Sequence, residues 1–388
     1  MHSDIGPGVA VHARGDVRRA GVQGTAVLGS TILLLASVAL PASAETRTYV
    51  VHKFVQAANS QDGDCGPKGP NEDADKLYAR YLAEFGKSPQ EVKRLITGWI
   101  SGGPEGRIVQ NMMVNRGRIN GEPVNAYTHP AAVKDPQLRM VISKYGYGFN
   151  LDGEVSPGDF IDPETGETGV DHAMFRALGC NLGFRGVLGS EGTYWAYNLQ
   201  LTGSEPAWLI SISGEDLNRD GPATITFERS YDHLKLMANG EPFPATTYRV
   251  DPDPRSHNVF PAHIKDGVLT LDEQVEFRMQ WNPLAMPELN LSRAKLRMKL
   301  KPDGTLEAVL GGFQPWISMY WAVAEGGYAK EEMVVGDVPG LYYTLKKSAD
   351  ADPDPETGQN QSISAAYHFV GVPAFHAPAI VRAQGEGR

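Results

Sequence analysis

Residues 293–300 read RAKLRMKL, and this stretch decides the fold class of the chain. Basic side chains occupy every second position, and the apolar side chains of Ala294, Leu296, Met298 and Leu300 occupy the positions between them. A period of two places each set on its own face of a β-strand, with the apolar face against a core. We interpret the basic face as solvent-exposed. The stretch therefore predicts a strand in a half-exposed antiparallel sheet.

Further strands and turns follow the same pattern from about residue 105 onward. Apolar and polar side chains alternate over residues 275–281, and short apolar runs are separated by turn sequences such as Asp266-Gly267 and Asp303-Gly304. Such pairs favour tight hairpins, because these turns need positive φ. We expect one late helix near residues 316–323, then strands at 340–346 and 363–370. The fold prediction is mainly β: an antiparallel, jelly-roll-like β-sandwich.

A small helical cap is expected before the sandwich. Residues 48–56 are typical of a strand, and the apolar side chains of residues 77–85 share one helical face. A second helix begins at Ser88, because Ser88 and Glu91 form a capping-box pattern with Pro89 at the first helical position. The predicted domains are a signal peptide (1–44), an N-terminal strand with a helical cap (45–104) and the β-sandwich (105–388).

The N-terminus has the order of a secretory signal peptide. Basic residues up to Arg19 precede an apolar run over 26–40, and Ala42-Ser43-Ala44 is a small-residue cleavage site. The apolar run is too short for a membrane span, and no longer one follows. We therefore expect an exported protein, periplasmic or extracellular. The net charge of −10 argues against a nucleic-acid partner, so a small molecule or a glycan is the expected partner.

The chain contains two cysteines, Cys65 and Cys180. In an exported protein such a pair most often forms a disulfide. The alternative is one buried thiol and one free thiol.

Two oxygen-rich segments are candidate calcium sites. Asp216, Asn218 and Asp220, followed by Gly221, match the first half of a calcium loop, although Phe227 stands where an EF-hand needs Glu. Residues 152–171 carry seven carboxylates and neither Lys nor Arg, so Asp152 and Asp171 could add ligands. The alternatives are a polar turn at 216–221 and a solvated loop at 152–171.

Several motifs together resemble a family of exported bacterial proteins of unknown function. They are YGYGFNLDG (145–153), DPETGETGVDH (162–172), RALGC (176–180) and ELNLSRAKLRMKLKPDGTLEAVLGG (288–312). The resemblance runs from about Cys65 to the last predicted strands, and His172 stands where the family pattern has Asn. It implies a β-rich exported protein and carries over no activity.

No residue is assigned a catalytic role. Gly189-Ser190-Glu191-Gly192 lacks the first glycine of a nucleophile elbow, and His257 and His263 lack zinc-site spacing. Acids beside Tyr194, Trp195 and Tyr197 are weak signs of a glycosidase, and Trp195 and Trp208 are typical core residues. We therefore expect a non-enzymatic exported protein that binds a ligand or acts at the cell envelope. The alternative is a carbohydrate-active or other secreted hydrolase, which should have a pocket with converging acids.

Overall fold

The computed structural model describes residues 44–185, 206–280, 288–325, 327, 331 and 336–377. These residues belong to one compact unit, Ser43–Arg388. The predicted signal peptide lies outside the described residues.

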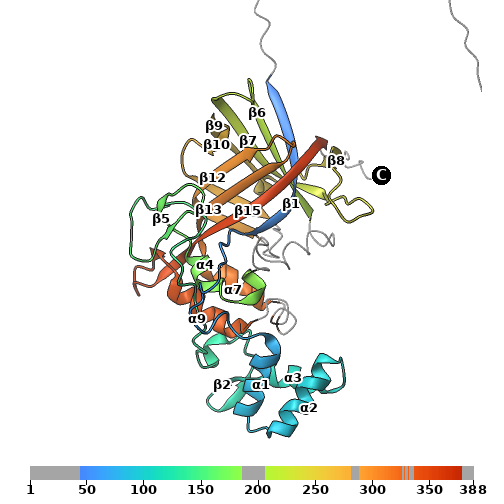
Figure 1. Ribbon diagram of the computed structural model, residues 1–388, viewed down its shortest axis with the longest axis vertical. Helices are drawn as coiled ribbons and strands as arrows, with labels where there is room; N and C mark the ends of the chain where they lie inside the picture. The colour runs from blue at the N-terminus through green and yellow to red at the C-terminus, as the bar shows by residue number, and fades with distance from the viewer. Residues whose placement is uncertain are drawn as a thin grey trace, which may run out of the picture. The chain divides into compact units, whose positions relative to one another are not determined.

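Eight antiparallel strands close into a barrel (Figure 1). In the order of pairing they are β1 (Glu45–Gln56), β6 (Pro206–Gly214), β7 (Gly221–His233), β9 (His257–Lys265), β10 (Val268–Leu271), β12 (Glu288–Leu300), β13 (Leu306–Pro315) and β15 (Asn360–Ala377). The first and last strands close the ring, with Thr48 opposite Ala374 and Gln56 opposite Tyr367. The predicted β-sandwich is therefore wrong. A single sheet closes on itself, and each of these strands has a partner on both sides.

Large side chains fill the interior of the barrel. Phe54 of β1 lies 5.1 Å, between ring centroids, from both Trp208 and Tyr367. Leu296 and Met298 of β12 belong to the same buried cluster, as the alternation in residues 293–300 predicts. The inward positions thus form a packed core, and chemistry must be sought on the outer face or at the ends of the barrel.

Shorter strands extend the barrel or form separate hairpins. β8 (Thr246–Arg249) and β14 (Ala351–Pro353) pair with β15, and β11 (Val275–Gln280) pairs with β12. The separate pairs are β2 (Gly117–Ile119) with β3 (Glu122–Val124) and β4 (Phe160–Ile161) with β5 (Thr168–Val170). The predicted turn at Asp266-Gly267 is confirmed, with positive φ at both residues, and Asn120-Gly121 between β2 and β3 also has positive φ at both residues.

Three helices lie at one end of the barrel and share its core (Figure 1). They are α4 (Ala173–Leu178), α7 (Trp316–Ala324) and α9 (Val338–Ser348), and α5 (Leu182–Arg185) follows α4. α7 confirms the predicted late helix. The strand predicted at 340–346 is wrong, because this segment lies in α9. Asp337 caps this helix by accepting from Gly340 N at 3.0 Å, and Leu341 and Leu345 are buried four residues apart.

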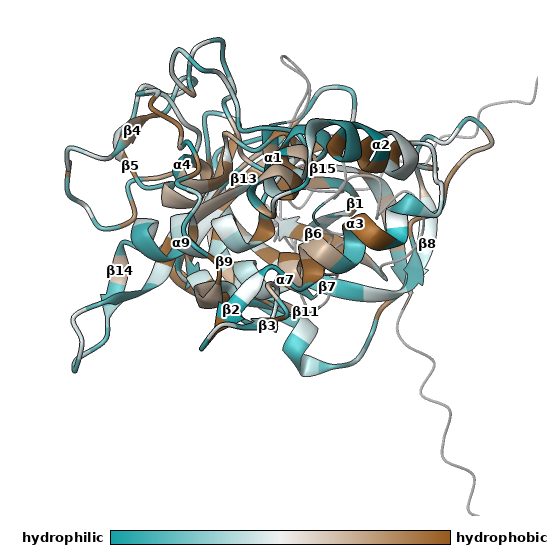
Figure 2. Cartoon of the chain, turned by 90° about the horizontal axis from the view of Figure 1, so that it is seen from below, coloured by the Kyte–Doolittle hydropathy of each residue, from teal (hydrophilic) through white to brown (hydrophobic). Residues whose placement is uncertain are grey.

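The helical cap has its own small core. α1 (Ala74–Glu84), α2 (Pro89–Ile100) and α3 (Glu105–Val114) bury apolar side chains among themselves, and hydrophilic and hydrophobic residues both occur along these helices (Figure 2). The predicted capping box at Ser88 and Glu91 is confirmed. The sequence does not predict α3. Two 3₁₀ turns, Pro130–Ala132 and Pro254–Ser256, complete the elements.

A buried ionic cluster joins the helical cap to the start of α9. Arg116 follows α3, and its Nη2 lies 2.6 Å from Glu331 Oε1 and 3.1 Å from Asp337 Oδ1. The Tyr127 hydroxyl donates to Glu331 at 2.6 Å, and the Tyr81 hydroxyl donates to Asp337. All three charged side chains are almost completely inaccessible to solvent. The ion pairs among them offset the free-energy cost of removing the three charges from water.

Candidate functional site

The segment that leads into the acidic residues packs on the outer face of the barrel. Phe149 and Leu151 form a buried cluster with Val309 and Ala366, which belong to β13 and β15. Gly311 permits this contact, because a Cβ there would lie 2.7 Å from the Phe149 ring. This packing holds the start of residues 152–171, named here the acidic segment, against β13 and β15.

The basic face of β12 supplies the cations that hold the acidic segment. Arg297 lies 2.8 Å from Asp162 (Nη2 to Oδ2), and Lys299 forms an ion pair with Glu164. The side chain of Arg297 is only 12% exposed. The prediction that this basic face is solvent-exposed is therefore wrong at Arg297, because an acidic segment 135 residues away in sequence covers it.

Asp162 fixes the DPETG turn in its ionised form. Its Oδ1 accepts from the backbone N–H groups of Glu164 at 2.8 Å and Thr165 at 3.0 Å, while Oδ2 accepts from Arg297. Burial acts to raise the pKa of Asp162, but these hydrogen bonds hold the pKa below its usual value. This turn is thus anchored by a buried carboxylate and forms a fixed wall beside β12.

A cavity of about 250 Å³ lies beside this wall, on the outer face of the barrel. Its floor is one row of outward-facing residues across the neighbouring strands β1, β15, β13 and β12. In this order the residues of the row are Val55, His368, Val309 and Arg297, each paired with the next. Tyr147, Glu164, Lys299 and Glu307 stand around this row, and Ala308 and residues 56–60 complete the lining. The cavity therefore combines an aliphatic floor with a polar rim.

Several polar atoms of residues that line the cavity have no hydrogen-bond partner in the described part of the chain. They are Asn59 Nδ2, Ser60 Oγ and both amide atoms of Gln56, a residue only 2% exposed. A buried polar group without a partner costs about 1–3 kcal/mol. Such groups are usually satisfied by a bound molecule or ordered water, so they mark this cavity as a candidate ligand site.

His368 and Glu307 form a pair on the cavity wall. His368 Nε2 lies 3.2 Å from Glu307 Oε1, and Glu307 also forms an ion pair with Lys301. Burial lowers the pKa of His368 even though Glu307 opposes this shift, so the imidazole is neutral at pH 7. Burial acts to raise the pKa of Glu307, but hydrogen bonds from Lys301 and His368 keep it below its usual value.

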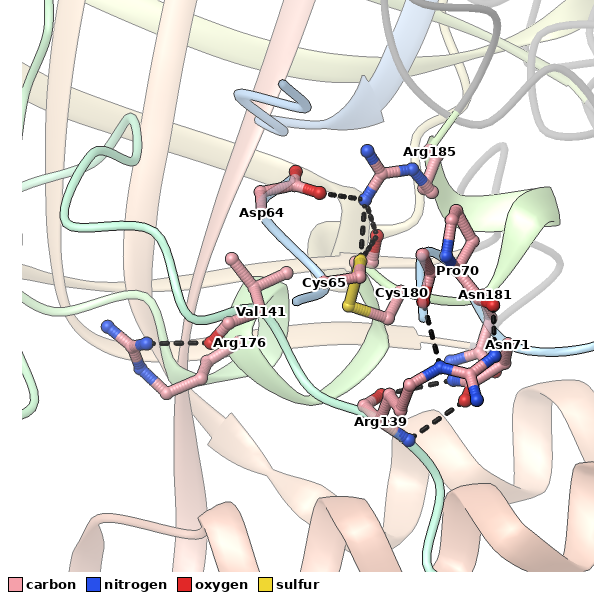
Figure 3. The surroundings of a disulfide bond; sticks show 12 residues. Asp64, Cys65, Pro70, Asn71, Arg139, Val141, Arg176, Cys180, Asn181 and Arg185 are labelled. Atoms are coloured by element: carbon pink, nitrogen blue, oxygen red, sulfur yellow. Dashed lines mark hydrogen bonds and ion pairs between the residues drawn. A yellow bond between two sulfur atoms is a disulfide. The ribbon is translucent and has the colours of Figure 1, made fainter. Parts of the chain in front are cut away.

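The predicted disulfide between Cys65 and Cys180 is confirmed, with 5.7 Å between the two Cα atoms. Arg185 lies against this bond (Figure 3). Its guanidinium pairs with Asp64 at 2.8 Å and donates to Gln61 O at 3.2 Å. The loop that carries Asn59 and Ser60 is therefore held at its far end by a covalent bond and an ion pair.

The predicted calcium ligands at 216–220 lie in the turn between β6 and β7. Asp216 Oδ1 accepts from Asn218 N at 2.9 Å, Asn218 Oδ1 accepts from Arg47 at 2.8 Å, and Asp220 Oδ1 accepts from Asp266 N at 2.9 Å. Each side chain is thus engaged by a different partner, as in a polar turn.

Asp152 and Asp171, the other predicted ligands, hydrogen-bond to nearby backbone. Asp171 Oδ2 accepts from Leu151 N at 2.7 Å, and Asp152 Oδ1 accepts from Glu154 N at 2.8 Å. Burial raises the pKa of Asp171 to about 6. Among the described residues, no three His, Cys, Asp or Glu side chains form a group that could hold a metal. The calcium site stays a prediction.

The remaining residues named in the sequence analysis lie in different parts of the structure. Trp208 lies in the barrel core, as expected. His257 and His263 each face an acid, Glu228 and Asp272 respectively. His172 is buried and bonds to Tyr147 O at 2.9 Å through Nδ1, and burial lowers its pKa to about 3. Tyr194, Trp195, Tyr197 and Gly189-Ser190-Glu191-Gly192 lie outside the described residues.

Sequence reasoning missed Asn59, Ser60 and His368. The one available signal for the first two was the run QAANS (56–60), where small and amide residues replace the apolar pattern of β1. His368 lies between Tyr367 and Phe369, so its outward direction follows from the strand period. Its neighbours on β1 and β13 could not be predicted from the sequence.

No family model, curated protein or solved structure matches this chain. The resemblance to exported bacterial proteins therefore stays a prediction. Within the described ranges, the helices are too short or too polar to span a membrane.

Proposed function

We propose that this is an exported, non-enzymatic protein that binds a small ligand in the cavity on the outer face of its barrel. One observation supports this most directly: Asn59 and Ser60 line the cavity, and each has a buried polar atom without a hydrogen-bond partner in the described part of the chain. Ligand sites typically combine an apolar lining with a few convergent polar groups. The disulfide and Arg185 hold the loop that carries both residues, which favours a preformed site.

Binding is favoured over hydrolysis by the state of the two acids on the rim. Glu164 and Glu307 are each bound to a lysine, Lys299 and Lys301. A glycosidase needs one carboxylic acid with a raised pKa to protonate the leaving group. The pKa of Glu307 is instead held below its usual value.

Ligand screening by thermal unfolding tests this proposal. The panel contains neutral sugars, carboxylic acids and amines, and at least one class should raise the unfolding midpoint of the wild type. A ligand at 100 times its Kd stabilises by about 2.7 kcal/mol. Ala58→Trp, which fills the cavity, should abolish the rise, whereas Ala131→Trp at an exposed position should not. A panel without effect would refute binding, and turnover of the bound compound would favour the hydrolase.

We further propose export with cleavage after Ala44, because the N-terminal residues have the order of a signal peptide. Sequencing of protein recovered from the periplasm or the medium should begin at Glu45. An intact Met1 in that fraction would contradict cleavage.

We also propose that calcium binds at Asp216, Asn218 and Asp220, with help from Asp152 and Asp171, because oxygen-bearing side chains alternate before Gly221. Millimolar calcium should then raise the unfolding midpoint relative to chelator, since a ligand of the native state stabilises it. Asp216→Ala and Asp220→Ala should reduce the rise. An unchanged wild-type midpoint would exclude the site.

A further inference from the structure

The charged groups around the cavity are already matched. Its lining includes two cations and two carboxylates, and all four belong to ion pairs: Arg297 with Asp162, Lys299 with Glu164, and Glu307 with Lys301. A charged ligand would have to compete with these pairings, and displacement of Asp162 from Arg297 would leave a fully buried carboxylate without its cationic partner. Among the described residues, every charged side chain of the rim therefore already has an ion-pair partner, and none is free to pair with a charged ligand.

The groups that remain for a ligand are neutral. Asn59 Nδ2 is a donor, and Ser60 Oγ can both donate and accept. Since His368 uses Nε2 for Glu307, its Nδ1 has no hydrogen bond to any residue in the described ranges, and the same holds for the Tyr147 hydroxyl. Mixed donors and acceptors of this kind match hydroxyl groups, which also donate and accept.

The floor and the size of the cavity restrict the ligand further. Val55, Ala57 and Val309 provide an aliphatic floor, and the Tyr147 ring adds an aromatic surface. The cavity volume of about 250 Å³ is smaller than the ~300–1,000 Å³ typical of drug-sized sites. A molecule with one ring, apolar C–H faces and a rim of hydroxyls fits both features.

We infer that the cavity binds a neutral, hydroxyl-rich ligand with the size of one sugar ring, either a free sugar or the end unit of a glycan. The inference rests on the proposed ligand-binding function and names its ligand class.

Titration of the purified protein with matched sugars tests this class. The probes are glucose, galactose, mannose and N-acetylglucosamine, with glucuronate and glucosamine as charged counterparts, followed by saturation-transfer NMR and calorimetry. At least one neutral sugar should bind, and the charged counterparts should bind at least about tenfold more weakly. The methyl glycoside and a disaccharide of the bound sugar distinguish a free sugar from the end unit of a glycan. If both compounds still bind, the ligand is a glycan end; if neither binds, the ligand is a free sugar.

Variants connect binding to the cavity. Ser60→Ala and Tyr147→Phe each remove one hydroxyl and should weaken the bound sugar about threefold to tenfold. Ser213→Ala, on β6 and paired with Thr46, is the matched control and should leave binding unchanged. Tyr147→Phe keeps the aromatic ring and its packing, so we expect this variant to fold like the wild type. A loss of affinity in it then reports on the missing hydroxyl.

The outcomes separate the two proposals. Preference for a charged probe, with binding sensitive to Ser60→Ala, would overturn the neutral ligand class and leave ligand binding in this cavity intact. Sugar binding insensitive to both hydroxyl variants would overturn the site. No binding by any probe would overturn the class, and the broader panel of acids and amines would then decide the proposed function.

Discussion

Replacement of Arg116 by methionine is expected to lower the free energy of unfolding by about 3–5 kcal/mol. The buried guanidinium is bound to Glu331 at 2.6 Å and to Asp337 at 3.1 Å. Its removal leaves two carboxylates in an apolar environment, where each loses its cationic partner. Chemical denaturation measures the loss. Arg107→Met, at an exposed position of α3, is the control and should change stability by less than about 0.5 kcal/mol.

The pH dependence separates this charge effect from lost packing. Burial raises the pKa of Glu331 above its usual value, so its contribution to wild-type stability is present at low pH and is lost as pH rises through the folded pKa. Without Arg116 that pKa rises further. The deficit of Arg116→Met should therefore be smaller at about pH 4 than at about pH 8.

A second variant tests the same explanation. Arg116→Met combined with Glu331→Gln and Asp337→Asn should recover most of the loss, because no charge then remains buried and Asn still caps α9. A deficit that neither low pH nor this combination reduces would show that the packing of Arg116 is responsible.

The strand pattern predicts several of the barrel's strands, β1, β12 and β15 among them, but not the closure of the sheet. Alternation in residues 293–300 predicts which side chains of β12 lie inside, because that depends only on the strand period. Closure depends on pairing between β1 and β15, whose residues Thr48 and Ala374 are far apart in sequence. A sandwich and a barrel both require one buried face per strand, so the pattern could not distinguish them.

Local patterns also failed where two segments meet. The acidic segment and the basic face of β12 are both evident in the sequence, yet local patterns predict solvent exposure for the basic face and a metal site or a solvated loop for the acidic segment. Arg297 and Asp162 form an ion pair where the segment that contains Phe149 packs over Gly311, a contact between parts of the chain that are far apart in sequence. The strand predicted at 340–346 failed for a related reason. Its aromatic residues favour β-structure, but the cap at Asp337 and burial against the barrel stabilise a helix.

The candidate site was the least predictable part. Its residues come from β1, β12, β13, β15 and the acidic segment, so no sequence motif contains it. The predicted disulfide nevertheless holds one of the segments that line the candidate site. Cys65 ends the loop that carries Asn59 and Ser60, and Cys180 follows α4 after the acidic segment.

Removal of this disulfide in Cys65→Ala/Cys180→Ala is expected to lower the free energy of unfolding by about 4–5 kcal/mol. The bond closes a loop between residues separated by 115 positions, so the unfolded chain of the variant regains a large conformational entropy. Denaturation with and without reductant measures the effect. The wild type should fall to the stability of the variant when reduced, and the variant should not respond. Thiol titration of the denatured, unreduced wild type should find no free thiol.

Loss of the disulfide should also weaken ligand binding under conditions where the variant stays folded. Without the bond, the loop keeps the contacts of Arg185 with Asp64 and Gln61 and the hydrogen bond from Ile142 N to Asp64 O, but it loses its covalent anchor. More of the ordering of Asn59 and Ser60 then takes place during binding, at a cost in entropy. Calorimetry should show a less favourable binding entropy, while Ser60→Ala should still reduce the remaining affinity. Equal affinity in the folded variant and the wild type would show that the loop is ordered without the disulfide, and the bond would then stabilise the fold alone.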